Sequence, residues 1–158
     1  SIARVDVDTY RFAANMRQPD PINAFAARYS LPHAAAAVIL RGHAGYHAFT
    51  DEVVRDPAIA ALRRRITVRE DPALNASVPR LKPARVTVTL TDGRQLTRQR
   101  ESARGDFQDP YREDDVRAKF RELAAVVLGP GAVPRVEALV DRLDALPRLA
   151  DLTAALRS

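Results

Sequence analysis

The stretch between Ala84 and Arg100 constrains the fold of this chain most strongly. Its first part alternates, so that Val86, Val88 and Leu90 share one face of a predicted strand. Asp92-Gly93 follows, a dipeptide typical of a two-residue β-hairpin turn, and residues 95–100 return as the partner strand. Because the partner is polar at nearly every position, we expect it at the edge of a sheet.

Two further strands are predicted by residues that alternate with a period near two. The first begins at Ile2 and places Val5 and Val7 on one face, and the second covers Ile66 to Arg69. The segment that follows, up to Pro83, contains several prolines and is expected to be irregular.

Helices are predicted in two groups, one before the hairpin and one after it. The alanine-rich stretch 22–40 is divided by Pro32, with Ser30 as a cap for the second piece, and residues 50–65 form two short helices. After a loop over residues 104–111, helices are expected over residues 113–128, 133–146 and 149–156, with Gly129-Pro130-Gly131 breaking the first from the second. This order predicts an α+β fold: a small, mostly antiparallel sheet with helices packed on one face, and a helical C-terminal half.

Length and composition favour one cytoplasmic domain. The chain has 158 residues, 46% of them hydrophobic and 28% charged, as in globular proteins of ordinary domain size. Its longest apolar run, Ala34 to Leu40, is too short to span a bilayer, and the first residues do not resemble a signal peptide, so no membrane partner is expected. The absence of cysteine excludes disulfides, thiolate nucleophiles and cysteine-ligated zinc.

The net charge of +5 raises the question of nucleic-acid binding. A phosphate-binding surface favours one sign of charge, whereas here arginines alternate with acids, as in Arg112-Glu113-Asp114-Asp115. The one concentrated run is Arg63-Arg64-Arg65, directly before a predicted strand. A solvated face, or a basic rim for a carboxylate-rich small molecule, is the favoured interpretation, and no nucleic acid is expected.

Residues that carry chemistry are few. His43 and His47 have the spacing of two metal ligands on one helical face, but Gly42 and Gly45 flank the first and no glutamate completes a zinc motif, so no metal is expected. Serine-hydrolase, phosphate-loop and dinucleotide-binding motifs are absent. The neighbouring carboxylates lie where helix capping or solvation accounts for them: Asp51-Glu52, Glu70-Asp71 and Asp114-Asp115.

Several segments, read in order, resemble the MmgE/PrpD family of 2-methylcitrate dehydratase, cis-aconitate decarboxylase and iminodisuccinate epimerase. Residues 26–42 are similar to its A-K-F-S-L-P-Y segment, residues 83–94 to its P-A-x-V-x-V-x-L-x-D-G-R hairpin, and residues 104–110 to its R-G-D-P-x-N-P loop. Weaker matches follow the same order: residues 56–62, 117–124 and 139–146. Each motif alone has little specificity, but together they cover nearly the whole chain.

The resemblance implies a two-domain subunit, in which a smaller α+β domain closes over a cleft shared with a large helical domain, and homodimers are common. Residues 1–158 would be the smaller, C-terminal, lid-like domain, and the helical domain would be its partner. Members abstract a proton next to a carboxylate of a di- or tricarboxylate and then lose water, lose carbon dioxide or return the proton. They use no organic cofactor, so none is expected here.

Two departures from the family pattern bear on the site. The family's K-x-Y-P-x-C-x-x-x-H motif, which supplies a catalytic lysine and histidine, is absent from residues 1–158. His33 falls where many members carry a tyrosine that faces the cleft, which makes it the candidate catalytic residue, with Arg28, Tyr29 and Ser30 as candidate substrate-binding residues. The alternative is a surface or half-buried histidine that packs at the start of a helix.

Two functions therefore remain open. The chain is either the substrate-closing domain of a lyase or isomerase, inactive when isolated, or a free-standing, non-catalytic binding or regulatory module. A closing domain should expose apolar surface where the helical domain packs, and Ala34 to Ala37 is the predicted place for it.

Overall fold

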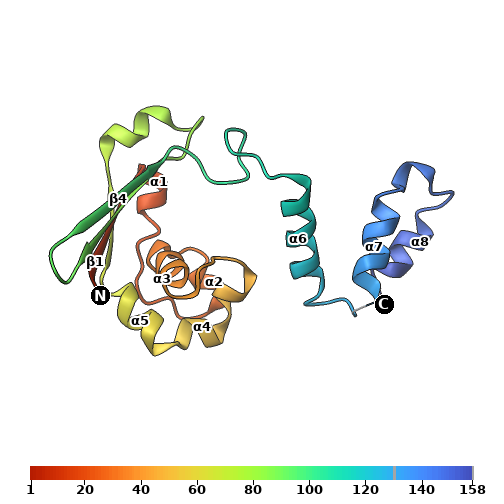
Figure 1. The fold of residues 1–158 in the computed structure, drawn as a ribbon, viewed down its shortest axis with the longest axis horizontal. Helices are drawn as coiled ribbons and strands as arrows, with labels where there is room; N and C mark the ends of the chain where they lie inside the picture. The colour runs from red at the N-terminus through yellow and green to blue at the C-terminus, as the bar shows by residue number, and fades with distance from the viewer. Residues whose placement is uncertain (130, 158) are drawn as a thin grey trace. The chain divides into compact units, whose positions relative to one another are not determined.

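The protein is described by a computed structural model that covers residues 1–129 and 131–157. The chain forms two compact units, Ser1–Asp109 and Pro110–Ser158. The first holds the sheet and a layer of helices, and the second is helical (Figure 1). The α+β class is confirmed. The single domain expected from the chain's length thus contains two units, although no long linker in the sequence marks the boundary.

The sheet of the first unit has the strand order β2-β1-β3-β4. Strand β1 (Ile2–Thr9) pairs in parallel with β2 (Ile66–Glu70) and antiparallel with β3 (Ala84–Leu90), which pairs antiparallel with β4 (Gln95–Arg100). Two of the three pairings are antiparallel, as expected. The register places Val5 opposite Ile66 on one side and opposite Val88 on the other, so apolar residues line the same face of three strands.

The α-helices of the first unit lie between β1 and β2 in sequence. They form the long crossover connection that two parallel strands require. Short helices α1 (Arg11–Ala14) and α2 (Ala24–Ala27) precede the longer α3 (Leu31–Arg41), which ends at Gly42 with a left-handed φ of 80°. A 3₁₀ turn η1 (Tyr46–Phe49) leads to α4 (Asp51–Arg55) and α5 (Pro57–Arg63). The segment expected to be irregular contains a second 3₁₀ turn, η2 (Pro72–Ser77).

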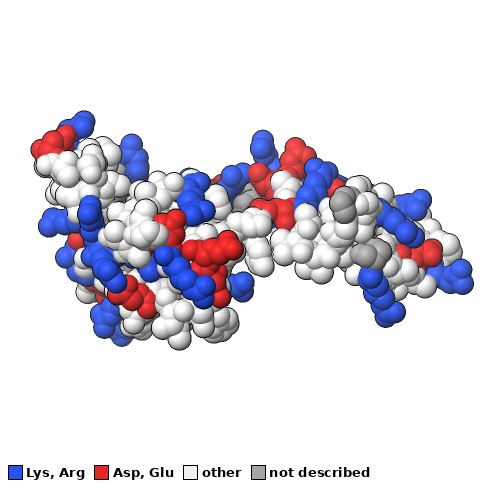
Figure 2. Space-filling view, turned by 90° about the horizontal axis from the view of Figure 1, so that it is seen from below, with Lys and Arg blue, Asp and Glu red and all other residues white. Residues whose placement is uncertain are grey.

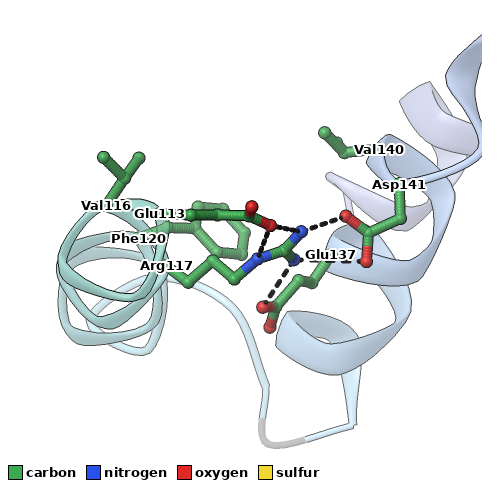
Figure 3. Close-up of a pocket in the computed structure, with 7 residues that line it drawn as sticks. All are labelled: Glu113, Val116, Arg117, Phe120, Glu137, Val140 and Asp141. Carbon is green, nitrogen blue, oxygen red and sulfur yellow. Dashed lines mark hydrogen bonds and ion pairs between the residues drawn. The ribbon is translucent and has the colours of Figure 1, made fainter.

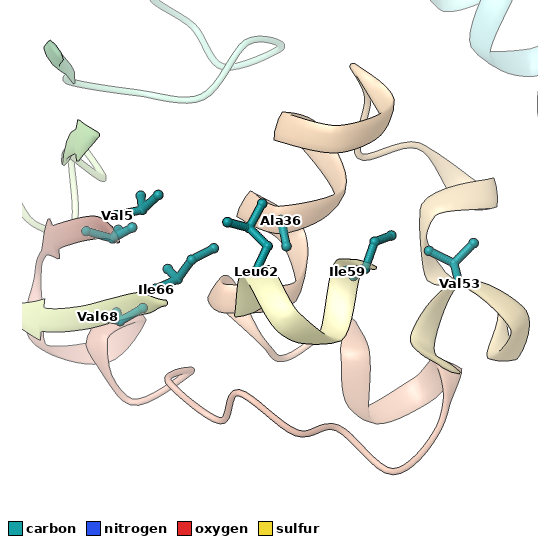
Figure 4. Packing of buried hydrophobic residues seen from close by; sticks show 8 residues of the cluster. Val5, Ala36, Val53, Ile59, Leu62, Ile66 and Val68 are labelled. Carbon is teal, nitrogen blue, oxygen red and sulfur yellow. The ribbon is translucent and has the colours of Figure 1, made fainter. Parts of the chain in front are cut away.

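The core of this unit lies between the sheet and helices α3 to α5. Val5, Val7, Ile66 and Val68 face Ala36 of α3 and the apolar residues of α4 and α5, Val53, Ile59 and Leu62 (Figure 4). Helix α3 packs against the sheet through Ala36, and the small alanine side chain allows the helix backbone to approach the sheet closely. Burial of these side chains is the main source of stability for the layer.

The hairpin forms where it is predicted, and β4 is confirmed as the edge strand. Its turn is longer than the predicted two residues. The hydrogen bond that closes it runs from the Leu90 amide to the Arg94 carbonyl, at 2.8 Å. A two-residue turn of the expected type needs positive φ at both central residues, whereas here Gly93 alone has it, at 86°.

The second unit consists of α6 (Glu113–Ala124), α7 (Ala132–Val140), a 3₁₀ turn η3 (Leu143–Ala145) and α8 (Ala150–Ala155). The first two helices end earlier than predicted, at Ala124 and Val140. The predicted break at residues 129–131 does separate α6 from α7, and Pro130 itself lies outside the described residues. Val136, Leu139 and Ala155 form a small core, while α6 contributes no fully buried residue.

Candidate functional site

The four candidate site residues fall at the junction of α2 and α3. Asn23 begins α2 by accepting a hydrogen bond from the Ala26 amide, 2.8 Å. Ser30 begins α3, where its hydroxyl accepts from the His33 amide at 3.1 Å and Pro32 occupies the first turn. The capping role expected for Ser30 is therefore confirmed.

The structure separates these residues into an exposed pair and a buried pair. Arg28 and Tyr29 lie at the end of α2, and Tyr29 is 58% exposed. Ser30 is buried, and besides capping α3 it donates its hydroxyl proton to the Gln18 carbonyl at 2.5 Å. Both hydrogen-bonding capacities of Ser30 thus serve the fold, while Arg28 and Tyr29 are accessible to a ligand or a protein partner.

His33 is 0% exposed, and both ring nitrogens have protein partners. Its Nε2 lies 2.8 Å from the Ala48 carbonyl, and its Nδ1 lies 3.0 Å from Nη1 of Arg63. The ring also packs against Phe49, with centroids 5.4 Å apart. The ring packs at the start of a helix, as in the alternative interpretation, but it is fully buried and not at the surface or half-buried as that interpretation expected.

Burial lowers the pKa of His33 below its usual value, because a charged ring would lose its hydration. The hydrogen bond to Ala48 opposes this shift, and the positive charge of Arg63 reinforces it. The neutral ring is therefore the favoured form at neutral pH.

Arg63 is the residue of this cluster that sequence reasoning missed. It is 4% exposed, and its Nη1 also donates to the Val54 carbonyl at 3.0 Å, while its Nε has no partner among the described residues. The run that contains it has no common role: Arg64 pairs with Asp20 at 3.3 Å, and Arg65 donates to the Ile2 carbonyl. A burial signal was present in the spacing of Ile59, Leu62 and Arg63 on one helix, but the charge of Arg63 concealed it.

The prediction that residues 34–37 form an exposed apolar patch is wrong. Ala36 and Ala37 are fully buried, and Ala34 and Ala35 are half-buried. Ala36, with Ala35 beside it, packs into the core against the sheet. Exposed apolar side chains occur at several other places in the chain, and one group of them lies on and beside α2. Ile22 is 87% exposed, Phe25 is 67% exposed, and the Phe25 ring lies 5.4 Å from that of Tyr29. We call Ile22, Phe25 and Tyr29 the α2 surface.

The second unit has a pocket of about 320 Å³ between α6 and α7 (Figure 3). Val116, Phe120 and Val140 form apolar walls, and Arg117 extends across the opening between the helices. Arg117 bonds three carboxylates, those of Glu113, Glu137 and Asp141, at distances from 2.6 to 3.2 Å. These acids raise the pKa of Arg117 and occupy its donors, so the guanidinium has little capacity left for an anionic ligand.

Charges elsewhere follow the interleaved pattern of the sequence. Lys and Arg side chains alternate with Asp and Glu over the surface seen in Figure 2. Within the part of the chain that the structure describes, no three histidine, aspartate or glutamate side chains gather as metal ligands would, and no helix is long and apolar enough to cross a membrane. The His43 ring accepts a bond from the Gly45 amide at 3.4 Å, as part of a local turn.

Comparison with known proteins decides the family. Residues 1–145 match the MmgE/PrpD C-terminal domain, a match that includes the whole first unit and most of the second. The chain belongs to the MmgE/PrpD family.

Two members of the MmgE/PrpD family show how much of such a protein is present here. The chain is 26% identical over 142 residues to cis-aconitate decarboxylase of Mus musculus and 25% identical over 142 residues to that of Homo sapiens. Each alignment covers 90% of this chain but 29% of the relative. The chain therefore spans less than a third of the length of these MmgE/PrpD proteins.

Proposed function

We propose that this chain is the part of an MmgE/PrpD enzyme that closes over an active site held mainly by a helical domain. The enzyme is a cofactor-independent lyase or isomerase that acts on di- or tricarboxylates, with 2-methylcitrate and cis-aconitate as the first substrates to test. Its family membership carries the proposal, since both relatives are cis-aconitate decarboxylases and share nearly the whole of this chain.

The α2 surface supports the closing role. Exposed aromatic and aliphatic side chains that lie together on one element are a common mark of a protein interface. The rings of Phe25 and Tyr29 pack against each other at an angle of 56°, and Arg28, next to Tyr29 in the sequence, carries a charge that suits a carboxylate. We propose that this surface meets the helical domain, with Arg28 and Tyr29 at the margin of the substrate cleft.

His33 enters the proposal as a positioning residue for α2 and α3, because a fully buried ring with two bonded nitrogens is not available to a substrate in this state. A direct catalytic role would require the ring to leave Ala48 and Arg63. We propose a homodimer for the complete enzyme, as the family resemblance implies.

The test compares the isolated chain with the polypeptide that joins it to a helical domain. Turnover of cis-aconitate or 2-methylcitrate by the joined form, and none by the 158-residue chain, is the expected result. Phe25→Asp in the joined form should lower turnover at least tenfold, whereas Leu96→Asp, an exposed change on the edge strand β4, should leave it within twofold. Equal losses in both variants, or no turnover in the joined form, would contradict the proposal.

A second candidate function is a free-standing, non-catalytic module. The buried state of His33 favours it, because the chain then offers no accessible general acid or base at that position. The intact mass of the native protein in its source cell separates the two. A native species of this length without a helical partner would favour the module.

A further inference from the structure

The His33 ring is held in one protonation state by its two partners. A backbone carbonyl only accepts hydrogen bonds, so Nε2 must carry the proton that bonds Ala48 at 2.8 Å. A guanidinium only donates, so Nδ1 must offer a lone pair to Nη1 of Arg63 at 3.0 Å. The structure therefore requires the neutral ring with its proton on Nε2.

This pair of side chains joins four elements of the helical layer. His33 belongs to α3 and bonds η1 through Ala48, while Arg63 belongs to the end of α5 and bonds the Val54 carbonyl of α4 at 3.0 Å. Helix α2, which carries the exposed aromatic surface, packs against both η1 and α4. Two buried hydrogen bonds, from His33 to Ala48 and from Arg63 to Val54, thus connect residues 46–55 to α3 and α5.

No negatively charged group among the described residues bonds His33 or Arg63, so a positive charge on the His33 ring would not be neutralised. Arg63 is the charged side chain that acts on the ring. Arg63 itself is influenced by Asp20, which favours its charge, and by Arg64, which opposes it. From η1 the ring meets the Ala48 carbonyl and the Phe49 ring, while His47 on the same turn is exposed.

We propose that His33 and Arg63 form an acid-sensitive latch that holds η1 and α4 against α3 and α5. A proton on Nδ1 removes the acceptor of Arg63 and places two cations side by side in the core, so the segment 46–55 is released. The latch is inferred from contacts within the first unit alone, so it does not depend on the proposed closing function.

The direction of the pH effect follows from the lowered pKa of buried His33. The released state, with a solvated ring, takes up a proton near the usual histidine value of about 6.5, before the latched state does. The latch is therefore fully effective above that pH. As the pH falls below it, the equilibrium constant for release rises by up to about tenfold per pH unit, until the latched ring also becomes protonated.

Hydrogen exchange of the whole chain tests the latch. After correction for the intrinsic pH dependence of exchange, peptides covering residues 46–55 should open more between about pH 7 and about pH 5.5, by roughly tenfold, while peptides of β1 keep their protection. His33→Gln is the matched control, because its amide can donate to Ala48 and accept from Arg63 but does not titrate. Unchanged opening of 46–55 in the wild type, or the same pH response in His33→Gln, would overturn the proposal.

A spectroscopic measurement covers the case in which His33→Gln fails to fold. Nitrogen-15 imidazole spectra of the wild-type chain should show His33 with its proton on Nε2 at neutral pH. The ring should become protonated only below the usual histidine range, together with the opening of residues 46–55. A His33 resonance that titrates at or above about 6.5 without any opening would overturn the latch.

Discussion

Arg117 and Glu137 connect α6 to α7 through a 3.0 Å bond between Nη1 and Oε1. Arg121 binds the same carboxylate from the next turn of α6, at 2.6 Å from Nη2 to Oε1. Because α6 contributes no fully buried residue, these ion pairs, the bonds from Arg117 to Asp141 and the partial burial of Phe120 hold it against the rest of the second unit.

Replacing Glu137 by Gln should therefore loosen α6. The two arginines lower the pKa of Glu137 to about 2, so the contribution of this carboxylate is complete above the ordinary glutamate value and is lost as the pH falls from about 4.5 toward 2. We expect faster hydrogen exchange in α6 of Glu137→Gln at neutral pH, and a smaller difference from the wild type near pH 2.5. Asp144→Asn, an exposed change in η3, is the matched control and should have no effect at either pH.

Ile59→Ala should strongly destabilise the first unit. Ile59 is buried between α3, α4 and the sheet side of the core, and its truncation leaves a cavity that costs about 2–5 kcal/mol of the free energy of unfolding. Urea denaturation followed by circular dichroism measures this loss. Ile22→Ala, which trims an exposed residue of the α2 surface, should change the value by less than about 0.5 kcal/mol in the isolated chain.

Thr9→Val should measure how much one buried hydrogen bond contributes to the free energy of unfolding. The Thr9 hydroxyl donates to the Pro83 carbonyl at 2.8 Å and thereby fixes the entry into β3 at the end of β1. Its loss leaves a buried carbonyl without this donor and should cost about 1–3 kcal/mol in thermal or urea unfolding. Thr67→Val on β2 exchanges the same groups at an exposed position, and an equal loss there would contradict the assignment.

Gly93→Ala should weaken the hairpin although the position has open space around it. A Cβ at Gly93 meets nothing within 4 Å, but its φ of 86° lies in the left-handed region, where a side chain costs about 1–2 kcal/mol. Gly129→Ala has equal space without positive φ and should be neutral within about 0.5 kcal/mol. A comparable loss in both variants would mean that strain at Gly93 is not the cause.

The elements that the sequence predicted well are those whose signals are local. Alternation at Val86 and Val88 with the following Asp92-Gly93 predicts the hairpin, and Ser30 before Pro32 predicts the start of α3. The parallel pairing of β1 with β2 could not be predicted, because the crossover that produces it depends on how α3 and α5 pack. The contact of His33 with Arg63 joins residues thirty positions apart and was hidden for the same reason.

The apolar surface illustrates a limit of composition-based inference. Consecutive alanines at residues 34–37 predicted exposure to a partner, but alanine is also the residue that lets a helix approach a sheet closely, and this second use prevails. A helical layer can have apolar side chains on both of its sides, and periodicity alone does not show which side packs against the sheet. The exposed Phe25 and Tyr29 were visible in the sequence only as part of a helix with no assigned face.

Strand β1 is the first strand in the sequence but an inner strand of the sheet, with β2 and β3 as its neighbours. During synthesis its two hydrogen-bonding edges must wait for residues 66–70 and then for residues 84–90. Such non-local pairing slows folding and leaves an apolar strand unprotected in the meantime. A nascent chain that stalls before β3 would therefore be prone to aggregation and dependent on chaperones, whereas loss of the helices after residue 110 would not disturb the order in which the sheet assembles.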